Sequence, residues 1–338
     1  MPATRVSIAR LAGVSVATVD RVLRNDPAVR VETFERVQAA LVSLRGERAT
    51  RGRPAKSTAF KVAFVVPLIK SRFVDQVERD IALSASFFRE HRIVHSFYRC
   101  DFASKQKTAQ FSASVGDYDA IVLLPLDYPW VDQLIEERFE AGVPVLTIFS
   151  DQPASRRTLF LGPDNRMMGR TAGLLMGRFT PGREGTIIIL SGSSRLSYQS
   201  ERRTGFEQIL EEDFKNLHWA VLPDFPTNED KACAVLMTAL AQYPDAVGIY
   251  ETSDSPEAVR RTLTQMQSKQ RIVCIGHGLS AVTRSMLTDG FMDVVLDQDS
   301  RGIVHAAGLA AVNLLNEVRG STLPPKQSIQ IFLRENVN

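Results

Sequence analysis

The sequence has few of the features that would mark a secreted, membrane-bound or metal-binding protein. Its 338 residues contain only three cysteines, Cys100, Cys233 and Cys274, too widely spaced for a metal motif or a disulfide framework. Buried thiols in a reducing compartment fit this usage. No apolar run is long enough to span a bilayer, and the first residues predict a polar helix rather than a signal peptide. We therefore expect a cytoplasmic protein with no membrane partner and no bound metal.

Motifs of common enzyme classes are also missing. The chain has no Walker lysine loop, no Gly-x-Ser-x-Gly elbow and no pair of histidines at metal spacing. The stretch Gly276-His277-Gly278-Leu279-Ser280-Ala281 follows a predicted strand and precedes a predicted helix, as a dinucleotide-binding fingerprint would. It lies late in the chain, however, and has Ala281 in place of the third glycine. We expect no cofactor and no enzymatic activity, and a Rossmann-type enzyme is the weaker alternative.

Positive charge is concentrated near the start of the chain. Residues 1–62 contain twelve Lys/Arg and five Asp/Glu, whereas the rest contains 29 and 33. A basic head on a mildly acidic body is typical of a nucleic-acid-binding module joined to a separate sensor.

Residues 4–24 predict two short helices around a tight turn. Gly13 lies where the chain reverses, because glycine accepts the left-handed conformation without steric cost. Thr4 or Ser7 can cap the first helix, and Ser15 can cap the second. This pattern predicts a helix-turn-helix with a second helix able to enter a major groove, and an ordinary helical hairpin is the alternative. The apolar positions expected to pack the two helices are Ile8, Leu11, Ala12, Val19, Val22 and Leu23.

A third helix over residues 29–44 would close this small core with Val31, Phe34, Val37, Ala40, Leu41 and Leu44. The helix-turn-helix domain is therefore predicted to span residues 1–44. Residues 45–59 contain no aliphatic anchor and many cations, which predicts a basic linker that is disordered without DNA.

The stretch from Leu11 to Val19, continued by Arg21-Val22-Leu23, resembles the DNA-binding signature of the LacI/GalR family of bacterial transcription regulators. Ser7 and Asp20 depart from the common pattern, in which aspartate and serine stand at these positions. An acidic residue near DNA repels phosphate unless it pairs with Arg21 or Arg24, or accepts a hydrogen bond from a cytosine amino group. The operator sequence is therefore not transferable from other members.

The start of the second helix is the predicted base-reading segment. We expect Val16 and Ala17 to touch bases, with thymine methyls as partners, and Arg21 to reach a guanine or a phosphate. The linker lacks the Tyr-x-Pro-Asn pattern and the hinge leucine that family members commonly carry. Its Arg51-Gly52-Arg53-Pro54 segment resembles an AT-hook core, and a plain basic linker that touches phosphates is the alternative. The predicted DNA contacts are Thr4, Ser15, Val16, Ala17, Thr18, Arg21, Arg24, Arg51 and Arg53.

From residue 60 short strands alternate with helices. This alternation predicts doubly wound parallel α/β architecture, and there are too many strands for one ordinary sheet, so two lobes are expected. The predicted strands are 61–66, 92–98, 120–124, 144–149, 158–162, 186–191, 220–222, 246–250, 271–275 and 294–296. The predicted helices include 73–89, 130–141, 165–179, 199–211, 229–242, 256–267 and 280–289.

The resemblance to the LacI/GalR family extends through this part of the chain. It rests on the segments 63–67, 142–145, 162–165 with Gly169, 202–206, 275–277 and 297–299. It implies the fold of periplasmic sugar-binding proteins, with two lobes, three crossovers and a ligand in the cleft. The effector-binding and dimerisation domain is expected over 60–338. Its N-lobe is about 60–163 plus 297–320, and its C-lobe about 164–296 plus 321–338.

Ligands of open α/β sheets bind beyond the carboxyl ends of the strands, where polar and aromatic residues cluster in this sequence. Planar hydrogen-bonding groups suit adjacent sugar hydroxyls, and aromatic faces suit the C–H side of a sugar ring. Arg202 and Gln298 also match motif positions of the family. Many members have an asparagine near Glu251 and an acidic residue after His277, where this chain has Gly278. The predicted ligand residues are Arg72, Phe73, Asp127, Tyr128, Phe149, Asp151, Asn165, Tyr198, Arg202, Glu251, His277 and Gln298.

These features together predict a cytoplasmic, homodimeric transcription regulator, a repressor of carbohydrate-use genes controlled by a sugar or glycoside. A dimer would read a pseudo-palindromic operator, because two-fold symmetry doubles the few base contacts of one head. A free-standing sugar-binding protein is the alternative, and the N-terminal head argues against it.

Overall fold

The computed structural model describes residues 5–23, 33, 36–37, 40, 59–266, 271–316 and 327–337. The chain divides into two compact units, residues 1–58 and 59–338, and each unit has its own apolar core. The predicted linker and most of the predicted third helix lie outside the described residues, as do Thr4, Arg24, Arg51 and Arg53.

In the first unit, α1 (Arg5–Ala12) and α2 (Val16–Leu23) join across a turn at Gly13, whose φ is +62°. Oγ of Ser15 accepts a hydrogen bond from the backbone N–H of Thr18 at 3.1 Å, so Ser15 caps α2. The small core contains Ile8, Ala9, Ala12, Val19, Val22, Val37 and Ala40. Leu11, predicted to lie in this core, is instead 52% exposed. The buried face of α1 is formed by Ile8, Ala9 and Ala12, so Leu11 lies at the edge of that face and is exposed to solvent.

Arg36 ties the predicted third helix to the turn. Thr33, Arg36, Val37 and Ala40, the described residues of that segment, are helical. The Arg36 guanidinium donates hydrogen bonds to the carbonyl oxygens of Ala12 (2.7 and 3.2 Å) and Gly13 (2.9 Å). Carbonyls at the end of a helix have no partner within it, so Arg36 satisfies the end of α1 and holds the turn before α2.

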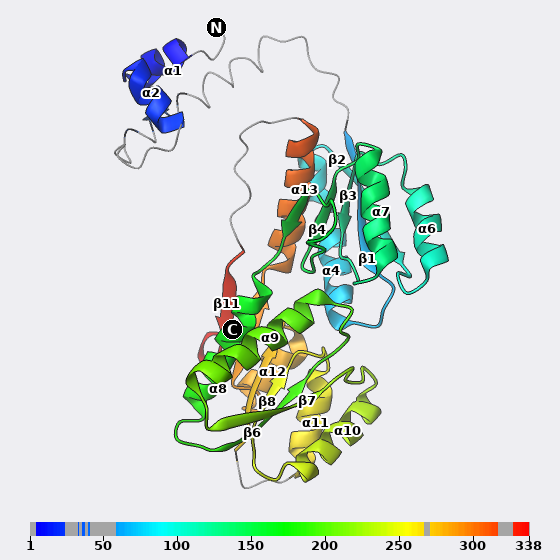
Figure 1. The fold of residues 1–338 in the computed structure, drawn as a ribbon, viewed down its shortest axis with the longest axis vertical. Coiled ribbons are helices and arrows are strands. Elements are labelled where there is room, and N and C mark those ends of the chain that lie inside the picture. Colours follow the sequence, from blue (N-terminus) through cyan, green and yellow to red (C-terminus); the bar gives the residue numbers. More distant parts are fainter. Residues whose placement is uncertain are drawn as a thin grey trace. The chain divides into compact units, whose positions relative to one another are not determined.

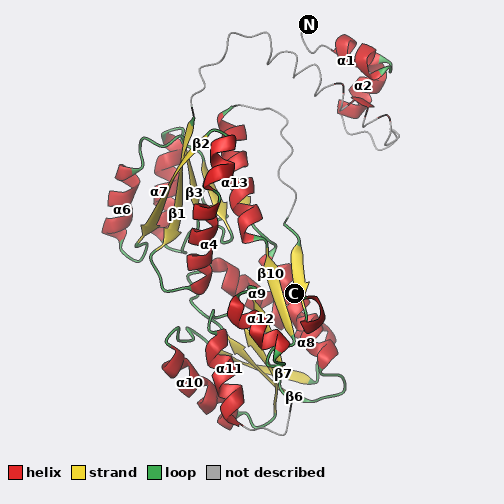
Figure 2. Cartoon of the chain, turned by 180° about the vertical axis from the view of Figure 1, so that it is seen from behind, coloured by secondary structure: helices red, strands yellow, loops and turns green. Residues whose placement is uncertain are grey.

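The second unit contains two sheets, each with helices on both faces (Figures 1 and 2). The first sheet is parallel throughout, in the order β2-β1-β3-β4-β5. Its strands are β1 (Phe60–Pro67), β2 (Ile93–Cys100), β3 (Ala120–Leu123), β4 (Val145–Ile148) and β5 (Leu159–Leu161). One face packs against α4 (Arg72–Leu83), α5 (Ala85–Glu90) and α13 (Ser300–Leu315), and the other against α6 (Lys105–Ser114) and α7 (Pro129–Glu140).

The second sheet has the order β11-β10-β9-β8-β6-β7, and β11 alone is antiparallel to its neighbour within this sheet. Its strands are β6 (Gly185–Leu190), β7 (Leu217–Leu222), β8 (Ala246–Glu251), β9 (Val273–His277), β10 (Val294–Gln298) and β11 (Ile329–Phe332). One face carries α10 (Glu229–Gln242), α11 (Pro256–Met266) and α12 (Ala281–Thr288). The other carries α8 (Asn165–Phe179) and α9 (Ser197–Asp213), and the 3₁₀ helix Arg334–Asn336 follows β11.

The two-lobed α/β architecture predicted from the sequence is confirmed, with differences in individual elements. The elements change lobe between β5 and α8, between β10 and α13, and between α13 and β11. The prediction did not name α6, α13 or β11. The predicted helix 73–89 is two helices, because Oγ of Ser84 donates to the carbonyl of Asp80 (2.6 Å) where α4 ends. Among the described residues, no helix combines the length and apolar character needed to cross a bilayer.

Helices α8 and α9 cross closely at two glycines. A Cβ at Gly169 would lie 1.9 Å from the carbonyl oxygen of Arg202, and one at Gly205 would lie 2.1 Å from that of Arg166. Both are backbone atoms that cannot move aside without separating the helices. This crossing therefore determines where Arg202 lies.

Gly205→Ala is expected to lower the free energy of unfolding by about 1–3 kcal/mol, the usual cost of overpacking, and to weaken binding of the predicted ligand by displacing Arg202. Urea denaturation and calorimetry measure the two effects. Gly116→Ala is the matched control, because its Cβ would meet no atom closer than 3.8 Å. An unchanged Gly205→Ala protein would show that the helices accommodate the methyl group.

Candidate functional site

A cavity of about 840 Å³ lies between the two lobes, where the strands end and the following helices begin. The first lobe contributes α4 and the start of α13, and the second contributes the ends of β8, β9 and β10 and the starts of α9 and α12. This is the position at which open parallel sheets bind ligands. The predicted ligand residues that line it are Arg72, Phe73, Tyr198, Arg202, Glu251, His277 and Gln298.

Arg202 is the buried cation of this cavity, with a residue exposure of 5%. Its Nε donates to Oδ1 of Asn165 at 3.0 Å, and its Nη2 donates to Oε1 of Gln298 at 3.3 Å. The guanidinium carbon lies 4.9 Å from the centre of the Tyr198 ring. Burial lowers the pKa of Arg202, yet a guanidinium remains charged at neutral pH. The cavity wall therefore presents a positioned, planar cation.

Aromatic rings from both lobes meet beside Arg202. Phe73 of α4 packs edge-on against Tyr198 of α9 and against Phe149, with ring centres 5.6 and 5.0 Å apart. Burial raises the pKa of the Tyr198 hydroxyl, which is therefore neutral. Phe73 and Tyr198 line the cavity, whereas Phe149 lies outside its lining. The pair forms an apolar surface suited to the C–H face of a ring.

Glu251 uses its carboxylate to build its own loop. Oε1 accepts hydrogen bonds from the backbone N–H and the hydroxyl of Ser253, both at 2.8 Å, and from the N–H of Ser255 at 3.0 Å. Burial raises the pKa of Glu251, and these hydrogen bonds oppose that rise. The side chain therefore stabilises the loop that follows β8 at the cavity wall.

His277 ends β9 and is held by Tyr250. Its Nε2 lies 2.8 Å from the Tyr250 hydroxyl, while its buried Nδ1 has no hydrogen-bond partner among the described residues. Burial, with a smaller contribution from the Arg202 charge, lowers the pKa of His277 well below 6.5. The imidazole is therefore neutral at neutral pH.

The lowered pKa of His277 predicts a pH dependence of stability. Below about pH 6.5 the unfolded chain binds a proton at this position before the folded chain does, so stability falls as the pH falls. The slope is at most about 1.4 kcal/mol per pH unit. His277→Gln should remove that contribution, measured as the difference between the two proteins in urea denaturation from pH 7.5 to 5.5. Parallel curves would show that His277 titrates normally in the folded protein.

Five predicted ligand residues lie outside the cavity lining. Asp127 and Tyr128 contact Arg195 instead: the backbone N–H of Asp127 donates to the Arg195 carbonyl (2.8 Å), and the Arg195 guanidinium lies 4.6 Å from the Tyr128 ring centre. Asp151 forms an ion pair with Arg157, with Oδ2 2.7 Å from Nη2. The side chains of Tyr128 and Asp151 therefore already have partners within the protein, whereas Asp127 contacts Arg195 through its backbone and is exposed.

Asn165 and Phe149 lie behind the cavity wall. Asn165 is buried and bridges two groups, donating to the Phe149 carbonyl at 3.1 Å and accepting from Arg202 at 3.0 Å. Asn165 therefore positions Arg202, and Phe149 supports Phe73.

The cavity also contains residues that the sequence reasoning did not select. Asp254 links the lobes, since its Oδ2 accepts from the Ser71 hydroxyl at 2.8 Å and from the Phe73 N–H at 3.2 Å. Asp297 and Asp299 also line the cavity, and their position just after a predicted strand could have identified them from the sequence. Asp80 and Arg301 gave no such signal, because they meet through packing of α13, a helix that was not predicted.

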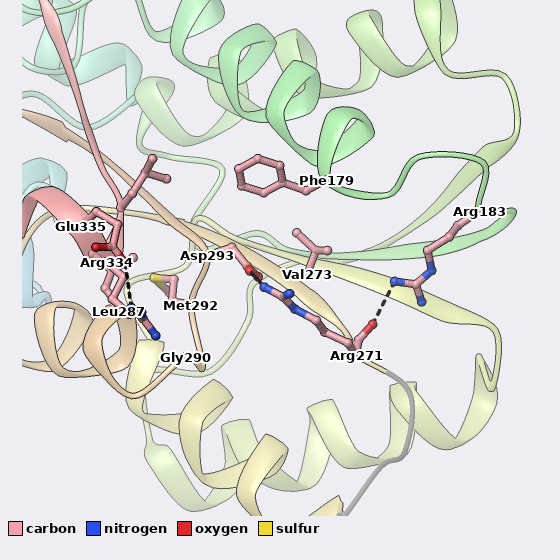
Figure 3. A pocket seen from close by; sticks show the side chains of 11 residues that line it. Phe179, Arg183, Arg271, Val273, Leu287, Gly290, Met292, Asp293, Arg334 and Glu335 are labelled. Carbon is pink, nitrogen blue, oxygen red and sulfur yellow. Dashed lines mark hydrogen bonds and ion pairs between the residues drawn. The ribbon is translucent and has the colours of Figure 1, made fainter.

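A second cavity, of about 490 Å³, lies at the start of β9 in the second lobe (Figure 3). Arg183 donates to the Arg271 carbonyl at 2.9 Å, Arg271 pairs with Asp293, and Arg334 pairs with Glu335 at 3.1 Å. These charged side chains thus have partners within the protein, and the cavity contains none of the predicted ligand residues.

The helix-turn-helix presents one face of α2, with its preceding cap residue, to solvent. Ser15, Val16, Ala17 and Arg21 are exposed, with Thr18 intermediate, on the side of α2 opposite the buried Val19 and Val22. Val16, an apolar residue, is exposed at the start of α2. An apolar side chain in this position suits contact with the methyl groups on base edges. This face contains every predicted base-reading residue that the structure describes.

Two family models match the chain. One, described as a periplasmic binding protein domain, matches residues 62–319, and the other, described as bacterial regulatory proteins of the lacI family, matches residues 7–45. The chain belongs to the LacI/GalR family. This LacI/GalR member is thus a DNA-binding regulator, with a helix-turn-helix head followed by a periplasmic-binding-protein-like domain. A search of curated proteins found no match.

Solved structures share the fold of the second unit at low sequence identity. GanP, a glucose-galactose binding protein from Geobacillus stearothermophilus, is 20% identical, with a TM-score of 0.72 over 82% of this chain and 98% of that protein. A candidate LacI transcriptional regulator from Bacteroides fragilis is 16% identical, with the same TM-score and coverages. A solute-binding protein from Burkholderia graminis, solved with D-arabinose, is 19% identical, with a TM-score of 0.72 over 83% and 98% of the two chains.

Proposed function

We propose that this regulator is a cytoplasmic, homodimeric repressor of carbohydrate-use genes, and that a sugar bound in the interlobe cavity changes its affinity for the operator. The observation that carries this proposal is the cavity wall, where a buried arginine stands beside aromatic rings contributed by both lobes. Planar donors and aromatic faces together suit a polyhydroxylated ring. The protein acts by binding rather than by catalysis.

The proposed roles follow the two units. Residues 1–44 read DNA through α2, residues 45–59 form a basic linker, and residues 60–338 bind the effector and dimerise. Arg202 and Gln298 hold sugar hydroxyls, while Phe73 and Tyr198 contact the ring face. The sugars bound by structural relatives, including D-arabinose, support this class of ligand.

A thermal-shift screen against sugars and glycosides, followed by operator binding with each hit, tests the proposal. A ligand at a hundred times its dissociation constant stabilises a protein by about 2.7 kcal/mol. A true effector must also change affinity for an operator selected from random DNA. Sugars that stabilise the protein without changing operator affinity would contradict regulation by this cavity. Light scattering during size-exclusion chromatography tests the dimer.

The linker supplies a separate prediction. Arg51 and Arg53 are expected to lie along the operator backbone or in its minor groove. Replacing both by alanine should weaken operator binding and flatten its salt dependence, by about 0.9 in log–log slope for each phosphate that is no longer neutralised. A larger decrease in affinity on operators with A·T-rich centres than on G·C-rich ones supports the hook, because A·T tracts narrow the groove. Equal decreases support the plain basic linker.

A further inference from the structure

The arginines that line the interlobe cavity differ in their partners. Arg72 forms an ion pair with Glu229 at 2.7 Å, and Arg301 pairs with Asp80 at 3.4 Å. Arg79 is exposed, so water can solvate its charge. These three cations are therefore neutralised or hydrated without a ligand.

Arg202 is buried and has only neutral partners. Its guanidinium donates to Asn165 and Gln298, and its Nη2 also lies 3.6 Å from the sulfur of Met168. No ion pair with a described carboxylate joins it, although the charges of Asp297 and Glu201 act on it from farther away. A buried charge without a counter-ion is costly, so this cation is electrostatically unsatisfied in the free protein.

The carboxylates in the cavity wall have hydrogen-bond donors of their own. Each accepts hydrogen bonds from protein donors: Asp75 from Arg99, Asp80 from Ser300, Glu251 from Ser253, Asp254 from Ser71, Asp297 from Leu279 and Asp299 from Gly302. These six carboxylates outnumber the four arginines of the wall, but no ion pair joins any of them to Arg202. The buried guanidinium itself, rather than the cavity as a whole, is therefore the group that lacks a counter-ion.

The start of α12 adds donors to the same wall. The N–H groups of Ala281 and Val282 open the helix, so neither has a carbonyl partner within it, and both residues line the cavity. The positive end of a helix favours an anion. Gly278, just before this helix, leaves room for a ligand group, because a Cβ there would meet no atom within 4 Å.

We propose that the effector is an acidic sugar, a uronic or aldonic acid, whose carboxylate pairs with Arg202. This inference rests on the proposed sugar effector and narrows it to one chemical class. The carboxylate supplies the counter-ion that Arg202 lacks, in the two-pronged geometry that a guanidinium favours. A neutral sugar would form hydrogen bonds with Arg202 but leave its charge uncompensated.

Isothermal calorimetry on the full chain tests this with matched ligands that differ in the carboxylate. The panel contains D-galacturonate and D-galactose, D-glucuronate and D-glucose, and D-gluconate and D-sorbitol, extended to the other common uronic and aldonic acids and their neutral parents. At least one acid should bind about tenfold or more tightly than its parent, because charge-assisted hydrogen bonds are roughly twice as strong as neutral ones. Arg202→Gln should reduce that preference to about threefold or less, while Arg203→Gln, on the same helix but outside the cavity, should preserve it.

The possible results distinguish the acidic effector inferred here from the more general proposal of a sugar effector. A neutral sugar that binds as tightly as every acid would overturn the acidic effector and leave a sugar effector standing. Failure of every member of the panel, acidic and neutral, to bind would overturn both. The comparison between acid and parent is made on the wild-type protein, so it holds even if Arg202→Gln fails to fold.

Discussion

Arg202→Ala is expected to abolish the effector response while leaving operator binding intact. The substitution removes the cavity's buried guanidinium and leaves the oxygens of Asn165 and Gln298 without their donor. Truncating one partner of a buried, charged hydrogen-bonding pair costs about 2–5 kcal/mol, so effector affinity should fall at least about thirtyfold. Calorimetry with the identified effector measures the decrease.

Arg203→Ala is the matched control for this experiment. Arg203 follows Arg202 on α9, but it pairs with Glu207 one turn along the same helix at 3.6 Å and does not line the cavity. Its removal should change effector affinity little. If Arg202→Ala is folded by circular dichroism and binds the effector normally, Arg202 has a structural role only.

Arg21→Ala is expected to weaken operator binding by about 1–3 kcal/mol if its guanidinium reads a guanine, and to relax specificity at one base pair. A phosphate contact would instead weaken binding evenly across sequences and lower the salt slope by about one. Fluorescence anisotropy at fixed salt, with single-base variants of a selected operator, distinguishes the two. Effector binding should not change.

Arg10→Ala provides the charge-matched control, because Arg10 is an exposed cation on α1 rather than on the base-reading face of α2. It should weaken operator binding less and without altering base preference. Removal of residues 1–58, a separate compact unit, should abolish operator binding entirely. Undiminished operator affinity in Arg21→Ala would rule out the proposed base contact.

Local sequence patterns determined the helix-turn-helix and most strands of the sensor. Gly13 marked the turn, Ser15 the cap and Val19 the buried face, because each depends on near neighbours along one or two helices. Buried parallel strands are likewise apolar runs that can be recognised without knowing their partners. Strand ends then indicated the cavity, where Phe73, Tyr198 and Arg202 do meet.

The tertiary structure alone decided which polar residues at the strand ends face the cavity. Asp127 and Asp151 looked equivalent to Arg202 in the sequence, but Arg157 pairs with the Asp151 carboxylate, and Asp127 is exposed outside the cavity lining. Both placements depend on how the loops after β3 and β4 fold back, which composition does not encode. The neutral partners of Arg202 are also decided by tertiary packing, because Asn165 comes from α8 and Gln298 from β10, which both pack beside α9. Partner choice is a property of long-range packing, whereas helices, caps and buried strands are properties of neighbouring residues.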